Sequence, residues 1–520
     1  MTAHLSAGPG SSSSGSSSSS SSLRGRSPSA GTAASDAGDE SPFELLRASL
    51  YSSAKVPEVF HEAARAEAAL QAQRTGATGG RAVVASFLDH AWGHTPPAAH
   101  VAAAKRQFGL YQQGNSTWDV LFGEVAPEAA GHVKRLLGLA EVGGATVQFG
   151  HNSHEIVTRL LSMPLERVLT REQSALRVLT TDTEFYSLTR QLNRLAEAGP
   201  AVQVQVVPIE PLDSFEERFV QRAAQSAFDF CYVSQCVFLS QQTLVARPVP
   251  FAVRLHAALE AALVAAGEVA QEGESAGAAP GSRARPRHAP LVVIDGYHSF
   301  GAIPTSLAGL PATCFFVSGV LKHVGAGANC AFLVIPPGGE RLLKPLLTGW
   351  LADPSVLSAD STGVAMGQRV GYGEGFSLLG GTPAFLPSLL IFVEVMRLWL
   401  ERGVTVDAVH EHVMALHRRF LQGLEARLAT VAPEAAPLSP ATLCRPLQPE
   451  AARSHTLVFR QVSPARSSRV VEYLRAAHGI EVDARKGFLR VGFGFNHSFA
   501  DVDRLLDALV ALSRARLVTS

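Results

Sequence analysis

Short apolar runs alternate with amphipathic stretches through the middle of this 520-residue chain. Seven of the runs have the length of buried strands and end in turn residues. These runs are 144–150, 176–182, 202–209, 228–238, 290–298, 314–319 and 330–336. The apolar spacing typical of helices occurs between them, at 154–163, 186–199, 214–226 and 253–268. Strands that alternate with crossover helices predict an α/β fold whose mostly parallel sheet is covered on both faces.

The pattern changes on either side of this region. Residues 1–41 are Ser-rich with few large apolar side chains, so we expect them to be disordered. Residues 42–115 combine helical spacing with a short strand-like run and are interpreted as an N-terminal arm. A large domain is expected over 116–385, interrupted by a surface insertion at 270–290 that is rich in Gly, Ala and Arg. Residues 386–520 predict a smaller α+β domain.

Composition narrows the range of partners. Lys plus Arg and Asp plus Glu both number 45, so no strongly basic surface for nucleic acid is expected. No uninterrupted apolar run reaches the roughly 18 residues of a membrane span. The N-terminus lacks the apolar core of a secretory signal, which favours a cytoplasmic location, or an organellar one if the Ser-rich segment is a transit peptide. The five cysteines lie mostly inside apolar runs and are interpreted as buried free thiols.

Two charged residues follow apolar runs at the expected edge of the sheet. Asp295 ends one run and Lys322 comes just after another. Ligands of open α/β sheets bind outside the carboxyl ends of the strands. A lysine in a dry pocket becomes nucleophilic towards carbonyls, and a buried carboxylate needs a partner. Pyridoxal phosphate (PLP) uses both, as a Lys Schiff base and an acid for its pyridinium nitrogen. Alone, each residue is equally explained as a helix cap or a solvated charge.

A phosphate site and a stacking ring are expected upstream. A strand ends at Gly150 and is followed by a polar turn and a helix, so the backbone at Asn152, Ser153 and His154 is a candidate phosphate site. Asn152 or Ser153 is equally explained as a plain N-cap. Phe185 follows another strand and is either a ring that stacks on the cofactor or a core residue.

With these residues in view, the chain resembles the class V aminotransferase family of fold-type I PLP-dependent enzymes, and within it the kynureninase branch. The resemblance runs from about residue 86 to 510. Its motifs are the Asp-x-x-His of Asp295 and His298, the Ser-x-x-x-Lys of Ser318 and Lys322, the segments "TGWL" with Trp350 and "GGTP" with Thr382, and a C-terminal strand with Arg490. It implies a large PLP-binding domain with a seven-stranded sheet and a small C-terminal domain.

The resemblance also implies roles for these residues. Lys322 would carry the Schiff base and act as the general base at the α-carbon. Asp295 would pair with the pyridinium nitrogen, and His298 would contact the ring. Arg490 would bind the α-carboxylate of a small amino-acid substrate, since its geometry suits a bidentate carboxylate contact. Trp350 and Thr382 match positions that reach the neighbouring subunit's phosphate, which implies a homodimer with shared active sites.

The reaction within this family stays open. Three positions depart from kynureninases: Leu321 replaces a tyrosine, Leu188 an aspartate and Glu155 a small hydroxyl residue. We expect a kynureninase-like hydrolase or lyase that cleaves the side chain, with an aminotransferase or an epimerase as the alternative. Cysteine desulfurase activity is disfavoured, because 479–490 contains no cysteine before the C-terminal arginine. A catalytically silent scaffold is the alternative of another class.

Overall fold

The computed structural model describes most of the chain from residue 85 to residue 515. The described ranges are 85–88, 96–114, 116–170, 172–199, 202–267, 289–358, 361, 364–381, 385–428, 438–439, 442–444 and 447–515. The Ser-rich segment 1–41, much of the predicted N-terminal arm, nearly all of the 270–290 insertion and Thr382 lie outside them. The interpretations that rest on those residues therefore stay predictions.

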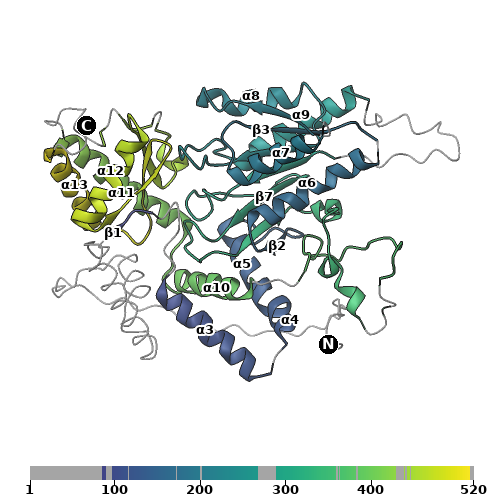
Figure 1. Cartoon of the computed structure of the whole chain (residues 1–520). Coiled ribbons are helices and arrows are strands. Elements are labelled where there is room, and N and C mark those ends of the chain that lie inside the picture. The colour runs from purple at the N-terminus through teal and green to yellow at the C-terminus, as the bar shows by residue number, and fades with distance from the viewer. Residues whose placement is uncertain are drawn as a thin grey trace, which may run out of the picture.

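A seven-stranded sheet forms the centre of the larger part of the molecule (Figure 1). The strand order is β2-β8-β7-β6-β5-β3-β4, and only β8 runs antiparallel to its neighbours in this sheet. The strands are β2 (Thr146–Gly150), β3 (Leu176–Thr181), β4 (Val202–Val207), β5 (Phe230–Ser234), β6 (Leu291–Asp295), β7 (Cys314–Gly319) and β8 (Ala331–Ile335). Each lies inside one of the predicted runs, so the mostly parallel seven-stranded sheet is confirmed.

The apolar runs form strands because both faces of the sheet are covered. Strands β6, β7 and β8 are buried at every position, as expected for the middle of an α/β sheet. Side chains alternate between the faces, so Val293 packs in one core while Val292 and Ile294 pack in the other. The edge strand β4 instead exposes Gln203 and Val204.

Helices cover the two faces unequally. One face carries α6 (Ser153–Leu169) and α7 (Tyr186–Ala198). The other carries α5, α8, α9 and α10, with α3 packed beside α10 (Figure 1). The bounds on that side are α3 (Pro97–Gln112), α4 (Thr117–Val120), the π-helix Leu121–Val125, α5 (Ala126–Leu136), α8 (Phe215–Ala223), α9 (Pro248–Ala265) and α10 (Leu386–Glu401). Short 3₁₀ helices occur at Leu212–Ser214, Gly339–Leu342, Trp350–Ala352, Pro354–Leu357 and Glu450–Ala452.

Helix α9 is, by length and composition alone, apolar enough to cross a membrane. Its Phe251, Leu255 and Leu259 are fully buried in the core that it shares with the sheet. Core helices of soluble proteins pass the same test, so α9 is weak evidence for a membrane span. Its burial accounts for its composition.

A smaller α+β unit follows α10 and has its own core. Its three-stranded antiparallel sheet has the order β11-β12-β9. The elements are α11 (Val406–Leu428), β9 (Thr456–Arg460), α12 (Pro464–His478), β10 (Ile480–Glu481), β11 (Asp483–Arg485), β12 (Phe488–Gly492) and α13 (Phe499–Arg514). They lie together at one side of the large sheet (Figure 1).

The first described strand belongs with this smaller unit. Strand β1 (Ala85–Ser86) pairs in parallel with β10. Phe87 is fully buried there, stacked on His497 at 4.6 Å between ring centroids and edge-on to Phe493. The smaller unit is therefore built from two distant parts of the sequence.

Candidate active site

The side chains predicted to carry the chemistry gather where the parallel strands end. Asp295 is the last residue of β6, Lys322 follows β7, and Phe185 follows β3. Because parallel strands present their carboxyl ends at one edge, these segments share the edge at which open α/β sheets bind ligands. Arg490, on β12, approaches from the smaller unit: its charge is among the causes that shift the pKa of Lys322. The fold thus brings together residues from four separate segments.

Asp295 is held as a buried hydrogen-bond acceptor. Its Oδ2 accepts from the Tyr232 hydroxyl at 2.6 Å, and its Oδ1 accepts from the Tyr297 backbone N–H at 2.8 Å. Burial raises the pKa of this carboxyl, and the two hydrogen bonds oppose the rise. The turn after it requires glycine, because a Cβ on Gly296 would lie 1.9 Å from the Phe316 ring. Sequence reasoning did not identify Tyr232, whose hydroxyl reaches Asp295 only through strand pairing.

Ser318 and His298 support the same turn. The Ser318 hydroxyl donates to the Gly296 carbonyl at 3.1 Å, so it fixes the backbone next to Asp295. His298 is buried, with its Nδ1 3.1 Å from the amide nitrogen of Gln241. Gln241 has a left-handed backbone with φ of 57° and also accepts a hydrogen bond from Ser454 of the smaller unit. Sequence reasoning missed Gln241, which connects the histidine to both units.

Lys322 lies in a setting that favours a neutral amine. Burial and, after it, the nearby positive charge of Arg490 lower its pKa to about 8, against the opposing effect of Asp483. A neutral amine is the nucleophilic form of lysine. Lys322 therefore has the electrostatic properties expected of a residue that attacks a carbonyl near pH 8.

Arg490 is buried and already paired with a carboxylate. Its Nε donates to Asp483 Oδ2 at 2.6 Å, its Nη2 contacts the same oxygen, and its Nη1 donates to the Phe238 carbonyl at 2.6 Å. A two-residue turn creates this pair: Lys486 and Gly487 both have positive φ, which sets Asp483 opposite Arg490. The arginine thus links β12 to the large unit, and Asp483 is a site residue that sequence reasoning missed.

Phe185 offers a partly exposed ring beside this edge. Its side chain is 44% exposed, and the ring meets Phe238 edge-on at 5.2 Å between centroids. The preceding residue, Glu184, is buried and accepts hydrogen bonds from Thr181 and Ser234. Burial, with a smaller contribution from the nearby Asp295, raises the pKa of Glu184 to about 7 against the opposing hydrogen bonds from Ser234 and Thr181. Glu184 was not predicted as a site residue, although it stands next to one that was.

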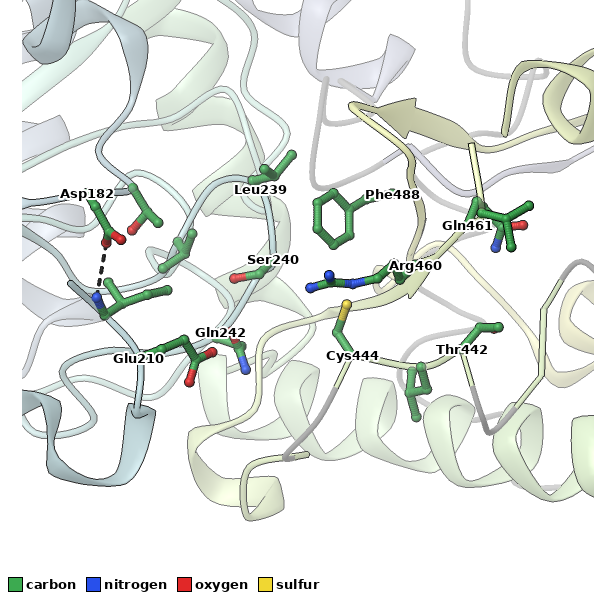
Figure 2. Close-up of a pocket in the computed structure, with 15 residues that line it drawn as sticks. Asp182, Glu210, Leu239, Ser240, Gln242, Thr442, Cys444, Arg460, Gln461 and Phe488 are labelled. Carbon is green, nitrogen blue, oxygen red and sulfur yellow. Dashed lines mark hydrogen bonds between the residues drawn. The ribbon is translucent and has the colours of Figure 1, made fainter. Parts of the chain in front are cut away.

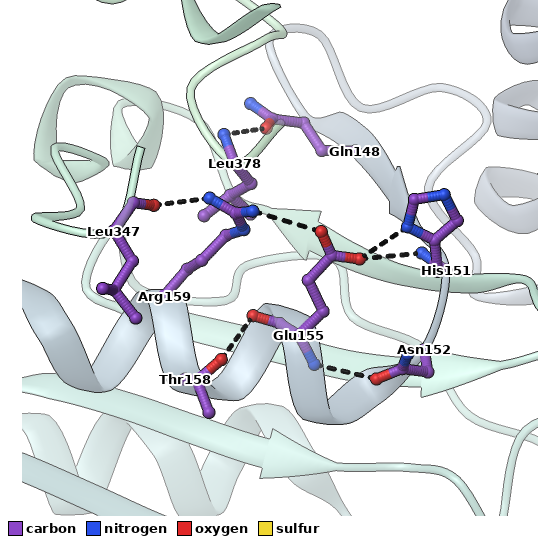
Figure 3. Close-up of polar contacts among 8 residues, drawn as sticks. All are labelled: Gln148, His151, Asn152, Glu155, Thr158, Arg159, Leu347 and Leu378. Atoms are coloured by element: carbon purple, nitrogen blue, oxygen red, sulfur yellow. Dashed lines mark hydrogen bonds and ion pairs between the residues drawn. The ribbon is translucent and has the colours of Figure 1, made fainter. Parts of the chain in front are cut away.

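The predicted phosphate turn is occupied by a side chain of the protein (Figure 3). Asn152 caps α6, accepting from the Glu155 backbone N–H at 2.9 Å. The Glu155 carboxylate folds back over the turn, where one oxygen accepts from the His151 backbone N–H at 3.2 Å and the other accepts from Arg159 at 3.2 Å. Ser153 begins the helix, and His154 is exposed. The plain N-cap interpretation of Asn152 is therefore observed.

Trp350 belongs to a segment that contacts α6 close to this turn. Its ring is 39% exposed and packs edge-on against Trp118 at 5.6 Å between centroids. Arg159 donates to the Leu347 carbonyl in the same segment (Figure 3). Thr382, the other residue predicted to reach across subunits, lies outside the described residues. The segment that carries Trp350 is thus tied to the start of α6.

A cavity of about 580 Å³ lies between the two units, beside the predicted site (Figure 2). Phe488 lines it and stands two positions from Arg490, on the same face of β12. The other lining residues are Asp182, Thr183, Ile209, Glu210, Val237, Leu239, Ser240 and Gln242 from the large unit, and Thr442, Leu443, Cys444, Arg460, Gln461 and Val462 from the smaller one. None of the residues predicted from the sequence lines this cavity.

The cysteines have the character of inert thiols. Cys231, Cys236, Cys314 and Cys330 are buried, and Cys444 is partly buried, all as free thiols. Burial raises the pKa of every one of them; for Cys444 it outweighs the nearby charge of Arg460. A nucleophilic cysteine needs a lowered pKa. The buried free thiols expected from the sequence are therefore observed.

These residues fit PLP unequally at its two ends. At the ring end, a buried acid at Asp295 and an amine of lowered pKa at Lys322 match what the cofactor needs. At the phosphate end, the Glu155 carboxylate accepts from the His151 backbone N–H in the turn before α6. The fit is complete only if that carboxylate leaves the turn.

Neither family models nor curated proteins match this sequence. Solved structures do. The chain is similar to the apo cysteine desulfurase from Thermococcus onnurineus NA1, with a TM-score of 0.57 at 14% identity over 83% of this chain and 95% of that one. It is also similar to the cystine C-S lyase C-DES in complex with its reaction product cysteine persulfide, with a TM-score of 0.57 at 13% identity over 81% and 96%.

A NifS-like protein gives a TM-score of 0.56 at 14% identity over 82% of this chain and 98% of that one. A further C-DES structure, of a lysine mutant, carries glycine covalently linked to its PLP cofactor. Identities this low establish the shared fold and leave the reaction open. The chain therefore has the α/β fold of these enzymes, the fold-type I architecture, with a large sheet-centred unit and a smaller C-terminal one.

Proposed function

We propose that this chain is a PLP-dependent enzyme that acts on a small amino acid, with Lys322 as the residue to which the cofactor attaches. One observation carries the proposal. A lysine with its pKa lowered to about 8 and a buried carboxylate, Asp295, occupy the same edge of a fold-type I sheet. A silent scaffold would need neither group, because burying each costs free energy.

The chemistry divides between cofactor and protein. PLP supplies a pyridine ring that withdraws electrons from the α-carbon of an attached amino acid. Asp295 would accept a hydrogen bond from the protonated ring nitrogen, and Tyr232 and the Tyr297 N–H hold the carboxylate in place for that task. Phe185 and His298 would be the residues that contact the ring. Lys322 in its neutral form would take a proton from the α-carbon of the bound amino acid.

Arg490 is the group that binds the α-carboxylate of the substrate in this proposal. Asp483 and the Phe238 carbonyl already occupy its Nε, one Nη2 proton and one Nη1 proton. A guanidinium has five N–H donors, so two remain for a carboxylate. Asp483 then serves to orient the arginine and to moderate its charge.

Side-chain cleavage is the reaction we propose, as in the kynureninase-like enzymes that the motifs resemble. A lyase that removes a β-substituent is the second candidate, favoured by the similarity in fold to the C-S lyase C-DES. The raised pKa values of the cysteines support a mechanism that uses no cysteine nucleophile. Transamination is the remaining alternative and would require a 2-oxo acid for turnover.

A homodimer with shared active sites is part of the proposal. Apolar side chains that are more than a third exposed gather in the segment of the large unit that carries Trp350. They are Leu346, Leu347, Trp350, Val364, Met366 and Val370. Exposed apolar side chains that are concentrated in one segment are typical of a protein–protein contact. Light scattering of the full chain should give twice the 55.0 kDa of one subunit, and a monomeric mass would contradict the shared site.

Covalent trapping tests the function. Full-length protein is mixed with PLP, reduced with borohydride and digested, and the modified peptide is mapped by mass spectrometry. We expect the label on Lys322, together with a visible absorbance band that borohydride abolishes. Amino acids, kynurenine and cystine among them, are then screened for product release with and without a 2-oxo acid.

Matched variants control this experiment. Lys322→Ala should lose both the label and all turnover, whereas Lys344→Ala, at an exposed lysine, should keep both. A label spread over surface lysines, or no absorbance band with excess PLP, would overturn the enzyme proposal in favour of the silent scaffold.

A further inference from the structure

The start of α6 holds an anion that belongs to the protein. Glu155 is the third residue of this helix, and its carboxylate turns back towards the N-terminus instead of pointing into solvent (Figure 3). Its Oε2 accepts from the His151 backbone N–H and lies 3.0 Å from His151 Nδ1. The positive end of the helix dipole favours a negative charge at this place.

The Glu155 carboxylate is ionised at neutral pH. Burial acts to raise its pKa, but the hydrogen bonds from His151 and Arg159 outweigh burial, and the net pKa is lowered. The carboxylate therefore meets any incoming anion with a full negative charge. Two anions cannot share a turn of this size without strong repulsion.

Arg159 lies beside the Glu155 carboxylate. Its Nη2 donates to Glu155 Oε1 at 3.2 Å, one helical turn along, and its Nη1 donates to the Leu347 carbonyl. Gly380 makes room for the guanidinium, because a Cβ there would lie 2.3 Å from Arg159 Nη2. If the carboxylate moved away, the guanidinium would stay where it is, held by Leu347.

We propose that Glu155 is an internal substitute for phosphate, and that it sets how tightly this chain binds ligands that carry a phosphate ester. A phosphate group binds when the Glu155 side chain rotates out, and it then takes over the His151 N–H and the Arg159 guanidinium. This inference rests on the proposed function, since it concerns the phosphate end of the same cofactor site. It makes Glu155 a specificity-determining residue and predicts weak selection for the phosphorylated over the unphosphorylated aldehyde.

Binding to the full chain freed of cofactor tests the inference. Dissociation constants are measured for PLP, for pyridoxal and for inorganic phosphate. We expect Glu155→Gln, which removes the charge and keeps the shape, to tighten PLP and phosphate by roughly ten- to a hundredfold, the range that one opposing charge produces near a protein surface. Pyridoxal, which lacks the phosphate, should bind equally to both proteins.

Glu128→Gln is the matched control. Glu128 has 28% of its side chain exposed against 26% for Glu155, it also pairs with arginines, and its pKa is likewise lowered. It lies on α5, among the helices of the opposite face of the sheet, and should leave all three constants unchanged. Adding Arg159→Met to Glu155→Gln should reverse the gain, because the phosphate loses its cation.

Two outcomes would overturn the inference. One is unchanged affinity for PLP and phosphate in both Glu155→Gln and Glu155→Ala, with thermal unfolding showing that at least one variant is folded. The other is equal tightening of pyridoxal and PLP, which would mean that the site has merely become more accessible. Failure of the proposed function looks different: no aldehyde would attach to Lys322, while the measurement with inorganic phosphate would still decide the role of Glu155.

Discussion

The two ends of the candidate cofactor site differ in how their charges are satisfied. At the ring end, burial disfavours the charged forms of Lys322 and Asp295. It lowers the pKa of the amine and raises that of the acid. At the phosphate end, Glu155, His151 and Arg159 satisfy one another, and the pKa of the acid is lowered.

The difference indicates that the ring end is built for a reaction, whereas the phosphate end is not built to bind phosphate tightly. Groups whose pKa values are shifted at the expense of stability are typical of functional sites. The hydrogen-bonded network of Glu155, His151 and Arg159 at the start of α6 stabilises the protein without any ligand. The ring end is thus poised for a reaction, whereas the phosphate end already contains its own anion. Substitutions at each end can test whether the two ends act independently.

Removing the acid at the ring end should have the largest effect. Asp295→Asn keeps the shape and the hydrogen bond from Tyr232 but cannot stabilise a protonated ring nitrogen. We expect turnover to fall by more than about 100-fold, as when other preorganised electrostatic groups are removed, while PLP still attaches to Lys322. Steady-state kinetics with the best amino acid from the screen measure this loss.

Asp213→Asn, at an exposed aspartate before α8, provides the control and should be silent. Turnover of Asp295→Asn within threefold of the unmodified protein would mean that the ring end is no better matched to the cofactor than the phosphate end.

Glu184 predicts a dependence of stability on pH. Its pKa is raised from 4.5 to about 7, so between these values the folded protein binds more protons than the unfolded chain. Stability from this group is fully present below pH 4.5 and is lost as the pH rises through about 7, by about 3 kcal/mol at about 1.4 kcal/mol per pH unit. Urea unfolding of Glu184→Gln should therefore vary less with pH over this interval than that of the unmodified protein.

Glu217→Gln, at an exposed glutamate of α8, should leave the pH dependence of unfolding as it is. If Glu184→Gln also leaves the pH dependence unchanged, the pKa of Glu184 is not raised in the folded protein, and Glu184 is ionised there at neutral pH.

Asp483→Asn should alter the ring end by a smaller amount. Asp483 raises the pKa of Lys322 while Arg490 and Arg485 lower it, so its removal should move the Lys322 titration from about 8 to lower pH. It also removes the negative charge that moderates Arg490, and we expect KM for the amino acid to fall by roughly tenfold, the value of one charged hydrogen bond. The rate of pyridoxal attachment against pH reports the first change, and kinetics report the second.

Asp507→Asn, which alters an exposed ion pair with Arg427, serves as the reference. An unchanged pH profile together with an unchanged KM would show that Asp483 neither moderates Lys322 nor competes with substrate for Arg490.

Much of the sheet could be predicted because its central strands are short, mostly apolar runs. The short apolar runs of β6, β7 and β8, bounded by turn residues, favour buried strands. Asp295 and Lys322 then follow from the rule that ligands bind at strand ends. The antiparallel direction of β8 could not be predicted, because the apolar pattern of a fully buried strand is the same for either direction.

The contacts between segments could not be predicted in the same way. Tyr232 reaches Asp295 only because β5 and β6 pair in one register. Gln241 meets His298 through a loop with a left-handed backbone that no motif marks. The pair of Asp483 and Arg490 did leave a signal: a Lys-Gly turn between two short strands fixes which residues face each other. Glu155 was recognised as a departure, but its contacts came from the structure.

The pairing of β1 with β10 has a consequence for the order of assembly. Ser86 and Glu481 are hydrogen bonded across 395 residues of sequence. During synthesis the large unit can fold before β10, the strand that pairs with residues 85–86, has been made. Phe87, which is fully buried in the finished protein, stays exposed throughout that interval. A fragment that starts at α10 would lack Phe87 and its contacts with Phe493 and His497, so the core of the C-terminal unit is complete only when residues 85–88 are present.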